Sequence, residues 1–192
     1  MDEIVIEFNQ FEVENGSNCC MAASMCFARL FLDQDIHRQD LERIIHAGAA
    51  LYGRWLEKRD TYHQQYWTCV TRDFPAFLSN ISCSFETNGF FDSNGTECTS
   101  SFDAVMCQLA SGGVRRGGVL TCEHSSYSIC FDGNYYYLFD PHGQRGGGAY
   151  MRRTKDVEIM KSFITSELVL SHRSQFSCVL FEAGSHNTDV VS

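Results

Sequence analysis

A thiol and an imidazole with a neighbouring carboxylate are the groups in this sequence whose types and spacing could do chemistry. Cys20 stands at the start of a helix-favouring segment, and Asp140-Pro141-His142 closes a strand-like segment. A thiol near its free pKa is mostly protonated at neutral pH, and a helix N-terminus or an adjacent imidazolium lowers that pKa. The combination predicts nucleophilic hydrolysis of the kind that cysteine proteases perform.

The carboxylate and the imidazole are separated by one residue. Side chains at positions i and i+2 of an extended strand share a face, so Asp140 and His142 are predicted to lie side by side. The carboxylate would fix the tautomer and orientation of the ring, leaving the other ring nitrogen for the thiolate. The D-x-H spacing alone is a weak signal, because an Asp-Pro turn beside a surface histidine produces it too. Asp35-Ile36-His37 repeats the spacing, but at a predicted helix start, where i and i+2 do not share a face.

Two further residues bear on the mechanism. Cys19 competes with Cys20 for the role of nucleophile, and only one of them can face His142, because a shift of one residue turns a helical side chain by ~100°. The local sequence leaves this choice open.

Acyl transfer also needs donors directed at the developing oxyanion, usually the N–H of the nucleophile and a side-chain amide. Gln10 is the candidate amide.

The composition is that of one globular domain. With 192 residues and 44% hydrophobic content, we expect a single domain over residues 1–182 and a polar, frayed tail over 183–192. No apolar run reaches the roughly 18 residues of a membrane span, and the acidic N-terminus is unlike a secretory signal. The net charge of -9, with no Lys/Arg cluster, argues against a nucleic-acid partner. We expect a cytoplasmic monomer that contacts no membrane.

Ten cysteines and seven histidines raise the question of disulfides and of zinc. Many of the cysteines lie in apolar runs, so we expect most of them to be reduced core residues. No C-x2-C pair exists, and Cys122-Glu123-His124 lacks a second pair at ligand spacing, which puts structural zinc at roughly one in ten. Thiol chemistry of this kind needs no cofactor, and we expect none.

The elements that would position these groups form a helix-rich first part and a sheet-rich second part. A turn over residues 15–18 offers N-cap candidates for a buried central helix, and Asp33 or Asp35 can cap the next helix. Ser101 can cap a third helix, and Asp132-Gly133-Asn134 can join two strands as a hairpin. The expected helices are 19–32, 39–56, 102–110 and 157–170, with a short one within 60–95; the expected strands are 4–8, 81–85, 118–122, 126–131, 135–139 and 176–181.

Three segments together resemble the deubiquitinase domain of herpesvirus large tegument proteins. They are Gln10, the run Gly16-Ser17-Asn18-Cys19-Cys20-Met21-Ala22-Ala23-Ser24 and the run Tyr137-Leu138-Phe139-Asp140-Pro141-His142-Gly143. That family has an oxyanion Gln, a G-S-Q-C-x-x-x-S helix start and an F-D-x-H strand end, and LERIIHAGAALY is similar to its second helix. The resemblance covers most of residues 8–145. The interval from Gln to Cys is a few residues shorter here, and an extra cysteine precedes the nucleophile.

The resemblance implies a role for each residue. The C-x-x-x-S pattern selects Cys20 as nucleophile, because Ser24 stands four residues after it. His142 becomes the base, Asp140 its orienter and Gln10 the oxyanion donor. The implied fold is a papain-like α+β domain, in which a helical lobe packs on a mostly antiparallel sheet.

The implied function is hydrolysis of the bond after the C-terminal glycine of ubiquitin or of polyubiquitin chains. The implied location is the virion tegument and the host cytoplasm or nucleus. The edge of the 125–131 strand could pair with the substrate tail by strand addition. A protease for another ubiquitin-like modifier or a peptide, and a non-catalytic ubiquitin-binding module, remain as alternatives.

Overall fold

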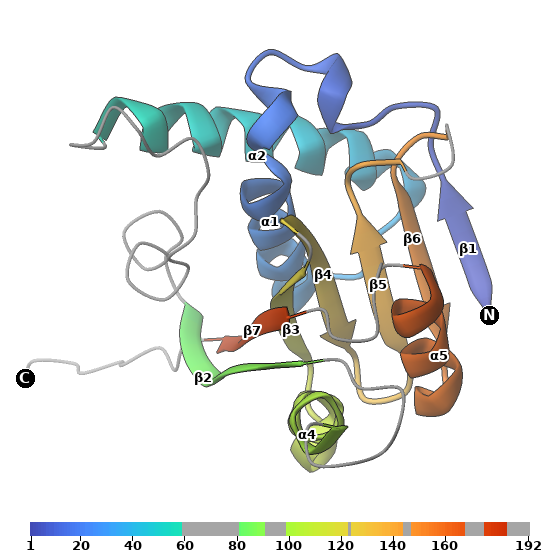
Figure 1. The fold of residues 1–192 in the computed structure, drawn as a ribbon. Coiled ribbons are helices and arrows are strands. Elements are labelled where there is room, and N and C mark those ends of the chain that lie inside the picture. The colour runs from blue at the N-terminus through green and yellow to red at the C-terminus, as the bar shows by residue number, and fades with distance from the viewer. Residues whose placement is uncertain (59–80, 91–98, 123, 144–146, 168–174, 184–192) are drawn as a thin grey trace, which may run out of the picture.

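A seven-stranded sheet forms the centre of the protein (Figure 1), with the strand order β1-β6-β5-β4-β3-β7-β2. The computed structural model describes residues 1–58, 81–90, 99–122, 124–143, 147–167 and 175–183. The strands are β1 (Asp2–Val5), β2 (Ile81–Phe90), β3 (Arg116–Cys122), β4 (Ser125–Phe131), β5 (Tyr136–Asp140), β6 (Tyr150–Thr154) and β7 (Gln175–Ala183). Every neighbouring pair in this order is antiparallel.

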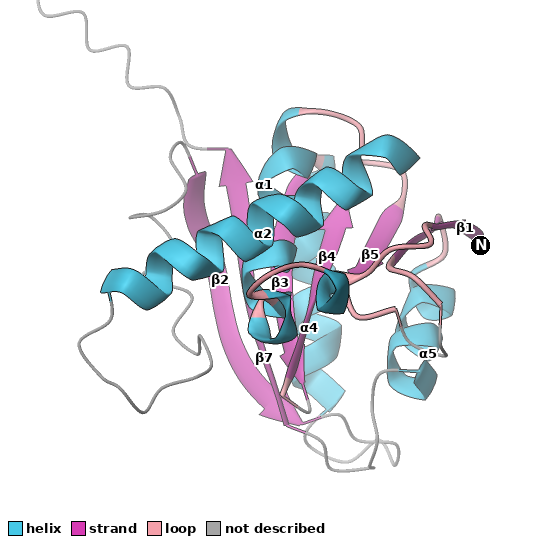
Figure 2. Cartoon of the chain, turned by 90° about the horizontal axis from the view of Figure 1, so that it is seen from above, coloured by secondary structure: helices cyan, strands magenta, loops and turns pink. Residues whose placement is uncertain are grey.

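Helices cover both faces of the sheet (Figure 2). They are α1 (Cys20–Asp33), α2 (Arg38–Lys58), α4 (Thr99–Ala110) and α5 (Val157–Glu167), with short 3-10 helices η1 (Gln10–Glu12), η2 (Gly16–Asn18) and η3 (Ser111–Gly113). One hydrophobic core joins α1 and α2 to one sheet face, and a second core joins α4 and α5 to the other face. The predicted mixture of helical lobe and antiparallel sheet is therefore present.

Small residues allow α1 to lie deep between α2 and the sheet. A Cβ at Gly48 of α2 would stand 2.5 Å from the Cα of Ala23, and one at Gly117 of β3 would stand 2.9 Å from the carbonyl oxygen of Ala28. Real Cβ atoms do not approach other atoms that closely, so these glycines set the spacing of the three layers. The prediction that the 19–32 segment is the central core helix is confirmed, with bounds shifted by one residue.

The expected helix caps are wrong in detail. Cys19 itself occupies the N-cap position of α1, without a side-chain capping bond, and residues 16–18 form η2 instead. Asp33 is the last residue of α1, and Asp35 pairs with Arg115. The start of α2 is held by Asp40, whose carboxylate accepts the N–H of His37. The third helix begins at Thr99, two residues before the expected cap at Ser101.

Most predicted strands are present with altered ends. β1 begins and ends earlier than the expected 4–8 segment, although Ile6 and Phe8 still exchange backbone hydrogen bonds with Ala149. β2 continues five residues past the expected 81–85. The hairpin forms as predicted, with the Asp132 carboxylate accepting the N–H groups of Asn134 and Tyr135. The short helix expected within 60–95 does not involve 81–90, and the rest of that segment lies outside the described residues, as do 168–170 and 184–192.

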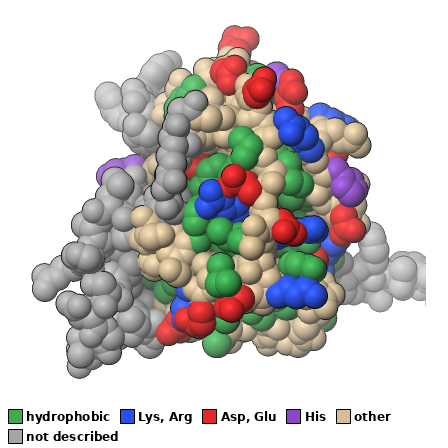
Figure 3. All heavy atoms as spheres, turned by 90° about the vertical axis from the view of Figure 1, so that its right-hand side faces the viewer, with side chains coloured by type: hydrophobic (Ala, Val, Ile, Leu, Met, Phe, Trp, Pro, Cys, Tyr) green, Lys and Arg blue, Asp and Glu red, His purple; other side chains and the backbone are tan. Residues whose placement is uncertain are grey.

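Contrary to the expected use of the 125–131 strand as a free edge, its residues 128–131 are paired on both sides. β4 lies between β3 and β5. It pairs with β3 along its whole length and with β5 from Ser128, whose partner is Phe139, to its end. The first three residues of β4 therefore have no partner on β5. The sheet ends at β1 and β2. Along β1, Glu3 pairs with Arg152 and Asp2 with Arg153, and that face of the molecule intersperses acidic and basic side chains (Figure 3). Such charges discourage strand addition.

No helix among the described segments is long and apolar enough to cross a membrane.

Candidate active site

The start of α1, the start of β4 and the end of β5 meet at one end of the sheet, the upper end in Figure 1. Two buried serine contacts join the first two elements. The hydroxyl of Ser24 donates to the carbonyl of Ser126 at 3.1 Å, and the hydroxyl of Ser128 donates to the carbonyl of Ser24 at 2.6 Å. Because Ser24 lies one turn after Cys20, these bonds fix the thiol relative to β4. The serine of the C-x-x-x-S pattern is thus an anchor between helix and sheet.

Asp140 and His142 are in direct contact, but not in the way the strand argument predicted. β5 ends at Asp140, and a turn follows. One oxygen of Asp140, Oδ1, accepts both the backbone N–H of His142 at 2.8 Å and its ring Nδ1 at 2.7 Å. The expectation of a shared strand face is wrong. A side-chain turn at the strand end holds the pair together instead.

This turn is needed because the carboxylate and the thiol belong to opposite faces of the sheet. Asp140 pairs in register with Tyr150, which belongs to the core under α4 and α5, whereas α1 packs on the other face. A straight continuation of β5 would keep His142 on the side of Asp140. By turning after Asp140, the chain carries the His142 ring to Cys20, with which it forms a hydrogen bond.

The environment of Cys20 favours the thiolate. Burial opposes ionisation, but the hydrogen bond and charge of His142, with backbone N–H groups of Ser126 and Met21, lower the pKa of Cys20 below its ordinary value. Burial also opposes the charged form of His142, yet its bonds to Asp140 and Cys20 raise the pKa of the ring to about 9. The two groups therefore stabilise each other as a thiolate and an imidazolium.

Cys19, the competing nucleophile, lies in a different environment. Its side chain is 0% exposed and belongs to the hydrophobic core between α1 and α2. Burial, with the nearby thiols, raises the pKa of Cys19 to about 12. Of the two neighbouring thiols, the structure brings Cys20 to His142 and leaves Cys19 in the core.

Gln10 lies beside this group and is only 1% exposed. Its backbone N–H donates to the carbonyl of Pro141 at 3.0 Å, so the residue between Asp140 and His142 holds η1 in place. Gly16 allows Gln10 to be buried, because a Cβ at Gly16 would stand 1.6 Å from the Gln10 carbonyl oxygen. Among the described residues, the side-chain oxygen of Gln10 has no hydrogen-bond partner. An unpaired buried acceptor costs ~1–3 kcal/mol, but the proposed oxyanion role needs the amide nitrogen of Gln10, which carries the N–H donors.

Three aromatic residues of the site were not singled out from the sequence. Tyr127 and Phe11 contact the His142 ring, with centroids 5.4 Å and 6.3 Å away. Tyr150 lies beside Asp140, and burial and that carboxylate raise its pKa. The alternation of apolar and polar residues along the 126–131 segment predicted that Tyr127 lies on one face of the sheet. No local signal shows that Tyr127 approaches His142, which follows later in the sequence.

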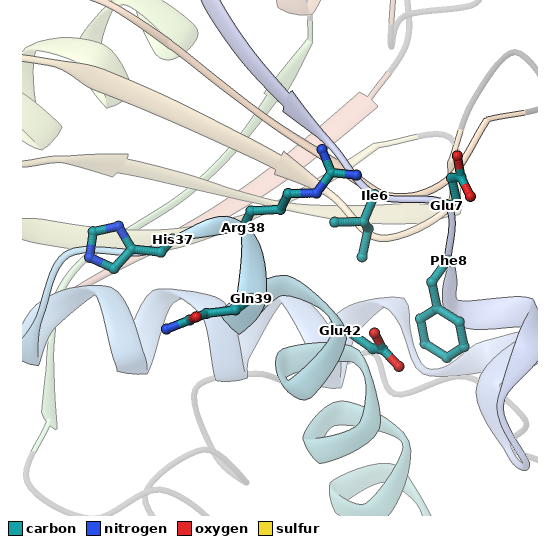
Figure 4. A pocket seen from close by; sticks show the side chains of 7 residues that line it. All are labelled: Ile6, Glu7, Phe8, His37, Arg38, Gln39 and Glu42. Carbon is teal, nitrogen blue, oxygen red and sulfur yellow. The ribbon is translucent and has the colours of Figure 1, made fainter.

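A separate open hollow of about 690 Å³ lies between the segment after β1 and the first turn of α2 (Figure 4). It is lined by Ile6, Glu7, Phe8, His37, Arg38, Gln39 and Glu42. None of the four predicted site residues lines it, so this hollow is not where the thiol chemistry would occur.

Eight cysteines are described, all of them as free thiols, and four are buried, so the expectation that most are core residues holds for half of these eight. Over the segments that the structure describes, no group of three or more His, Cys, Asp or Glu side chains could hold a metal ion.

Comparisons with known proteins give a family and a fold. Residues 4–181 match the family model described as herpesvirus tegument protein, N-terminal conserved region. A comparison with curated proteins gives no match. Among solved structures, the ubiquitin-specific protease encoded by murine cytomegalovirus tegument protein M48, solved with a ubiquitin-based suicide substrate, is similar with a TM-score of 0.71 and 14% identity, over 100% of this chain and 90% of that one.

A second similar structure is the Pseudomonas avirulence protein AvrPphB, with a TM-score of 0.54 and 14% identity, over 86% of this chain and 93% of that one. At such low identity these likenesses concern the fold. They confirm the papain-like α+β architecture that the resemblance implied.

Proposed function

Since the chain belongs to the family of herpesvirus tegument protein N-terminal conserved regions, we propose that it is a cysteine-type deubiquitinase that hydrolyses the bond after the C-terminal glycine of ubiquitin. Cys20 is the nucleophile, His142 the general base and acid, Asp140 the orienter of the ring and Gln10 the oxyanion donor. The observation that carries the proposal is the chain of contacts from Cys20 through the His142 ring to the Asp140 carboxylate.

The proposed reaction has two halves. The Cys20 thiolate attacks the glycine carbonyl, and the negative charge that develops on oxygen is stabilised by the first-turn N–H of α1 and the Gln10 amide. His142 then donates its proton to the leaving lysine amine, giving a thioester between Cys20 and ubiquitin. In the second half, His142 takes a proton from water, which attacks the thioester and releases ubiquitin.

The choice of ubiquitin rests on the family and on the M48 structure, which holds a ubiquitin-based suicide substrate. Ubiquitin ends in Gly-Gly, so a narrow channel that admits no side chain would select it. We also propose that the protein acts as a monomer, in the virion tegument and in the host cytoplasm or nucleus, on ubiquitin or polyubiquitin chains.

Ubiquitin with a thiol-reactive C-terminal warhead tests the nucleophile and the modifier together. Wild type, Cys19→Ala and Cys20→Ala are incubated with it and examined by intact mass. We expect one adduct in wild type and in Cys19→Ala, and none in Cys20→Ala. An adduct lost in Cys19→Ala instead would show that the wrong thiol was assigned.

Parallel probes built on other ubiquitin-like modifiers serve as the specificity control. A folded wild type that reacts with one of those and not with ubiquitin would establish the alternative modifier. Ubiquitin binding without any adduct would establish a non-catalytic binding module.

A further inference from the structure

Phe11 is an exposed aromatic ring at the catalytic histidine. Its side chain is 56% exposed, and it is the one aromatic residue among the large hydrophobic side chains that the described structure leaves exposed. Single exposed hydrophobic residues are common and need no function. The position of Phe11 is what matters, because its ring centroid lies 6.3 Å from that of His142.

The backbone around Phe11 is fixed from both sides. Asn9 and Glu12 form a reciprocal capping box, in which the Asn9 N–H donates to Glu12 and the Phe11 N–H donates to the Asn9 side chain at 2.9 Å. Gln10 donates to the carbonyl of Pro141. The same turn that carries His142 therefore holds η1, and the Phe11 ring is presented to solvent from a pre-organised backbone.

The two aromatic neighbours of His142 differ in access. Tyr127 is 2% exposed and belongs to the core, so no substrate can reach it. Phe11, by contrast, is 56% exposed, so it is the aromatic neighbour of His142 that solvent reaches. General acid catalysis requires the proton donor within hydrogen-bond reach of the leaving nitrogen, so the leaving group must lie beside His142. A chain attached to that nitrogen and extending toward solvent then passes the exposed neighbour of His142.

We propose that Phe11 is a specificity-determining residue for the leaving-group side of the cleaved bond, where it packs against the methylene stem of the target lysine. This inference rests on the proposed deubiquitinase function. A lysine stem is apolar and packs well on an aromatic face, whereas the ubiquitin half of the substrate enters from the other side of the scissile bond. Phe11 would favour isopeptide bonds to lysine over bonds to small leaving groups.

Two substrates that share the ubiquitin half and differ in the leaving group distinguish a contact of Phe11 with the leaving group from a general effect on catalysis. One carries a lysine peptide joined by an isopeptide bond, and the other is the C-terminal methyl ester, whose leaving group is too small to reach Phe11. For Phe11→Ala, we expect kcat/KM to fall about tenfold or more on the isopeptide and to stay within about twofold on the ester. Phe11→Leu, which keeps an apolar side chain, should retain most of the isopeptide activity.

Val114→Ala is the matched control, because Val114 is 48% exposed and precedes β3 at the end of the sheet opposite to Cys20. It should leave both rates unchanged. Equal losses on both substrates in Phe11→Ala, or a shifted alkaline limb of its pH profile, would overturn the proposal in favour of an effect on His142 itself. An unchanged isopeptide rate would overturn it as well. A folded wild type that cleaves neither substrate would instead refute the proposed function, and this inference with it.

Discussion

Cys19 and Cys20 are adjacent in sequence, but the pKa values of their thiols are shifted in opposite directions. The pKa of Cys20 is lowered by its contact with His142, whereas burial raises the pKa of Cys19 to about 12. At pH 6, a neutral alkylating agent such as iodoacetamide should therefore modify Cys20 far faster than Cys19. Peptide mapping after a short exposure measures this, with His142→Ala as the control in which the low-pH reactivity of Cys20 is lost. Preferential labelling of Cys19 would contradict the assignment.

The pH dependence of the reaction follows from the direction of the two shifts. The reactive pair exists between the lowered pKa of Cys20 and the raised pKa of His142, so kcat/KM should fall at high pH as His142 loses its proton near pH 9. Asp140→Asn removes the negative charge that favours imidazolium and replaces a charged hydrogen-bond acceptor by a weaker neutral one. Its alkaline limb should move to lower pH, and the rate should drop by about 10²–10⁴-fold. A pH profile of the two enzymes checks this, and an unmoved limb would argue against a role for Asp140.

At the scale of elements, the position of Cys20 depends on how closely α1 can approach α2 and β3. Gly48→Ala would place a Cβ 2.5 Å from the backbone of Ala23 and should destabilise the fold by ~1–3 kcal/mol through overpacking. Gly53→Ala is the matched control in the same helix, because its nearest neighbour, the amide nitrogen of Asn15, would be 3.7 Å away. That variant should gain ~0.5–1 kcal/mol from helix propensity. Urea unfolding measures both changes, and similar values would contradict the packing argument.

At the scale of the whole molecule, the net charge of -9 gives a long-range attraction for basic substrates. Ubiquitin's tail carries arginines ahead of its Gly-Gly end, so raising the salt from 50 to 500 mM, concentrations at which the Debye length falls severalfold, should lower kcat/KM through a slower association. Alkylation of Cys20 by neutral iodoacetamide is the control and should not change. A salt-independent kcat/KM would show that the overall charge plays no part.

The sequence by itself determined the residues that could do chemistry and the elements that carry them. The Cys19-Cys20 pair at a helix start and Asp140 with His142 at a strand end stand out from their immediate neighbours, and the resemblance then selects Cys20. The core helix was predictable for the same reason, since composition and periodicity within about 14 residues decide it. Gln10 was only one candidate amide until the resemblance gave it a role, because a single glutamine has no local signature.

Only the tertiary structure decided how those residues meet. Cys19 is buried because α2 packs against α1. The turn after Asp140 brings the His142 side chain from one face of the sheet to the other. The place of β4 inside the sheet likewise depends on strands distant in sequence. Phe11 reaches His142 because Gln10 bonds to Pro141 across 131 residues of chain. Local patterns carry no information on contacts between such distant segments, since packing of the whole chain selects them.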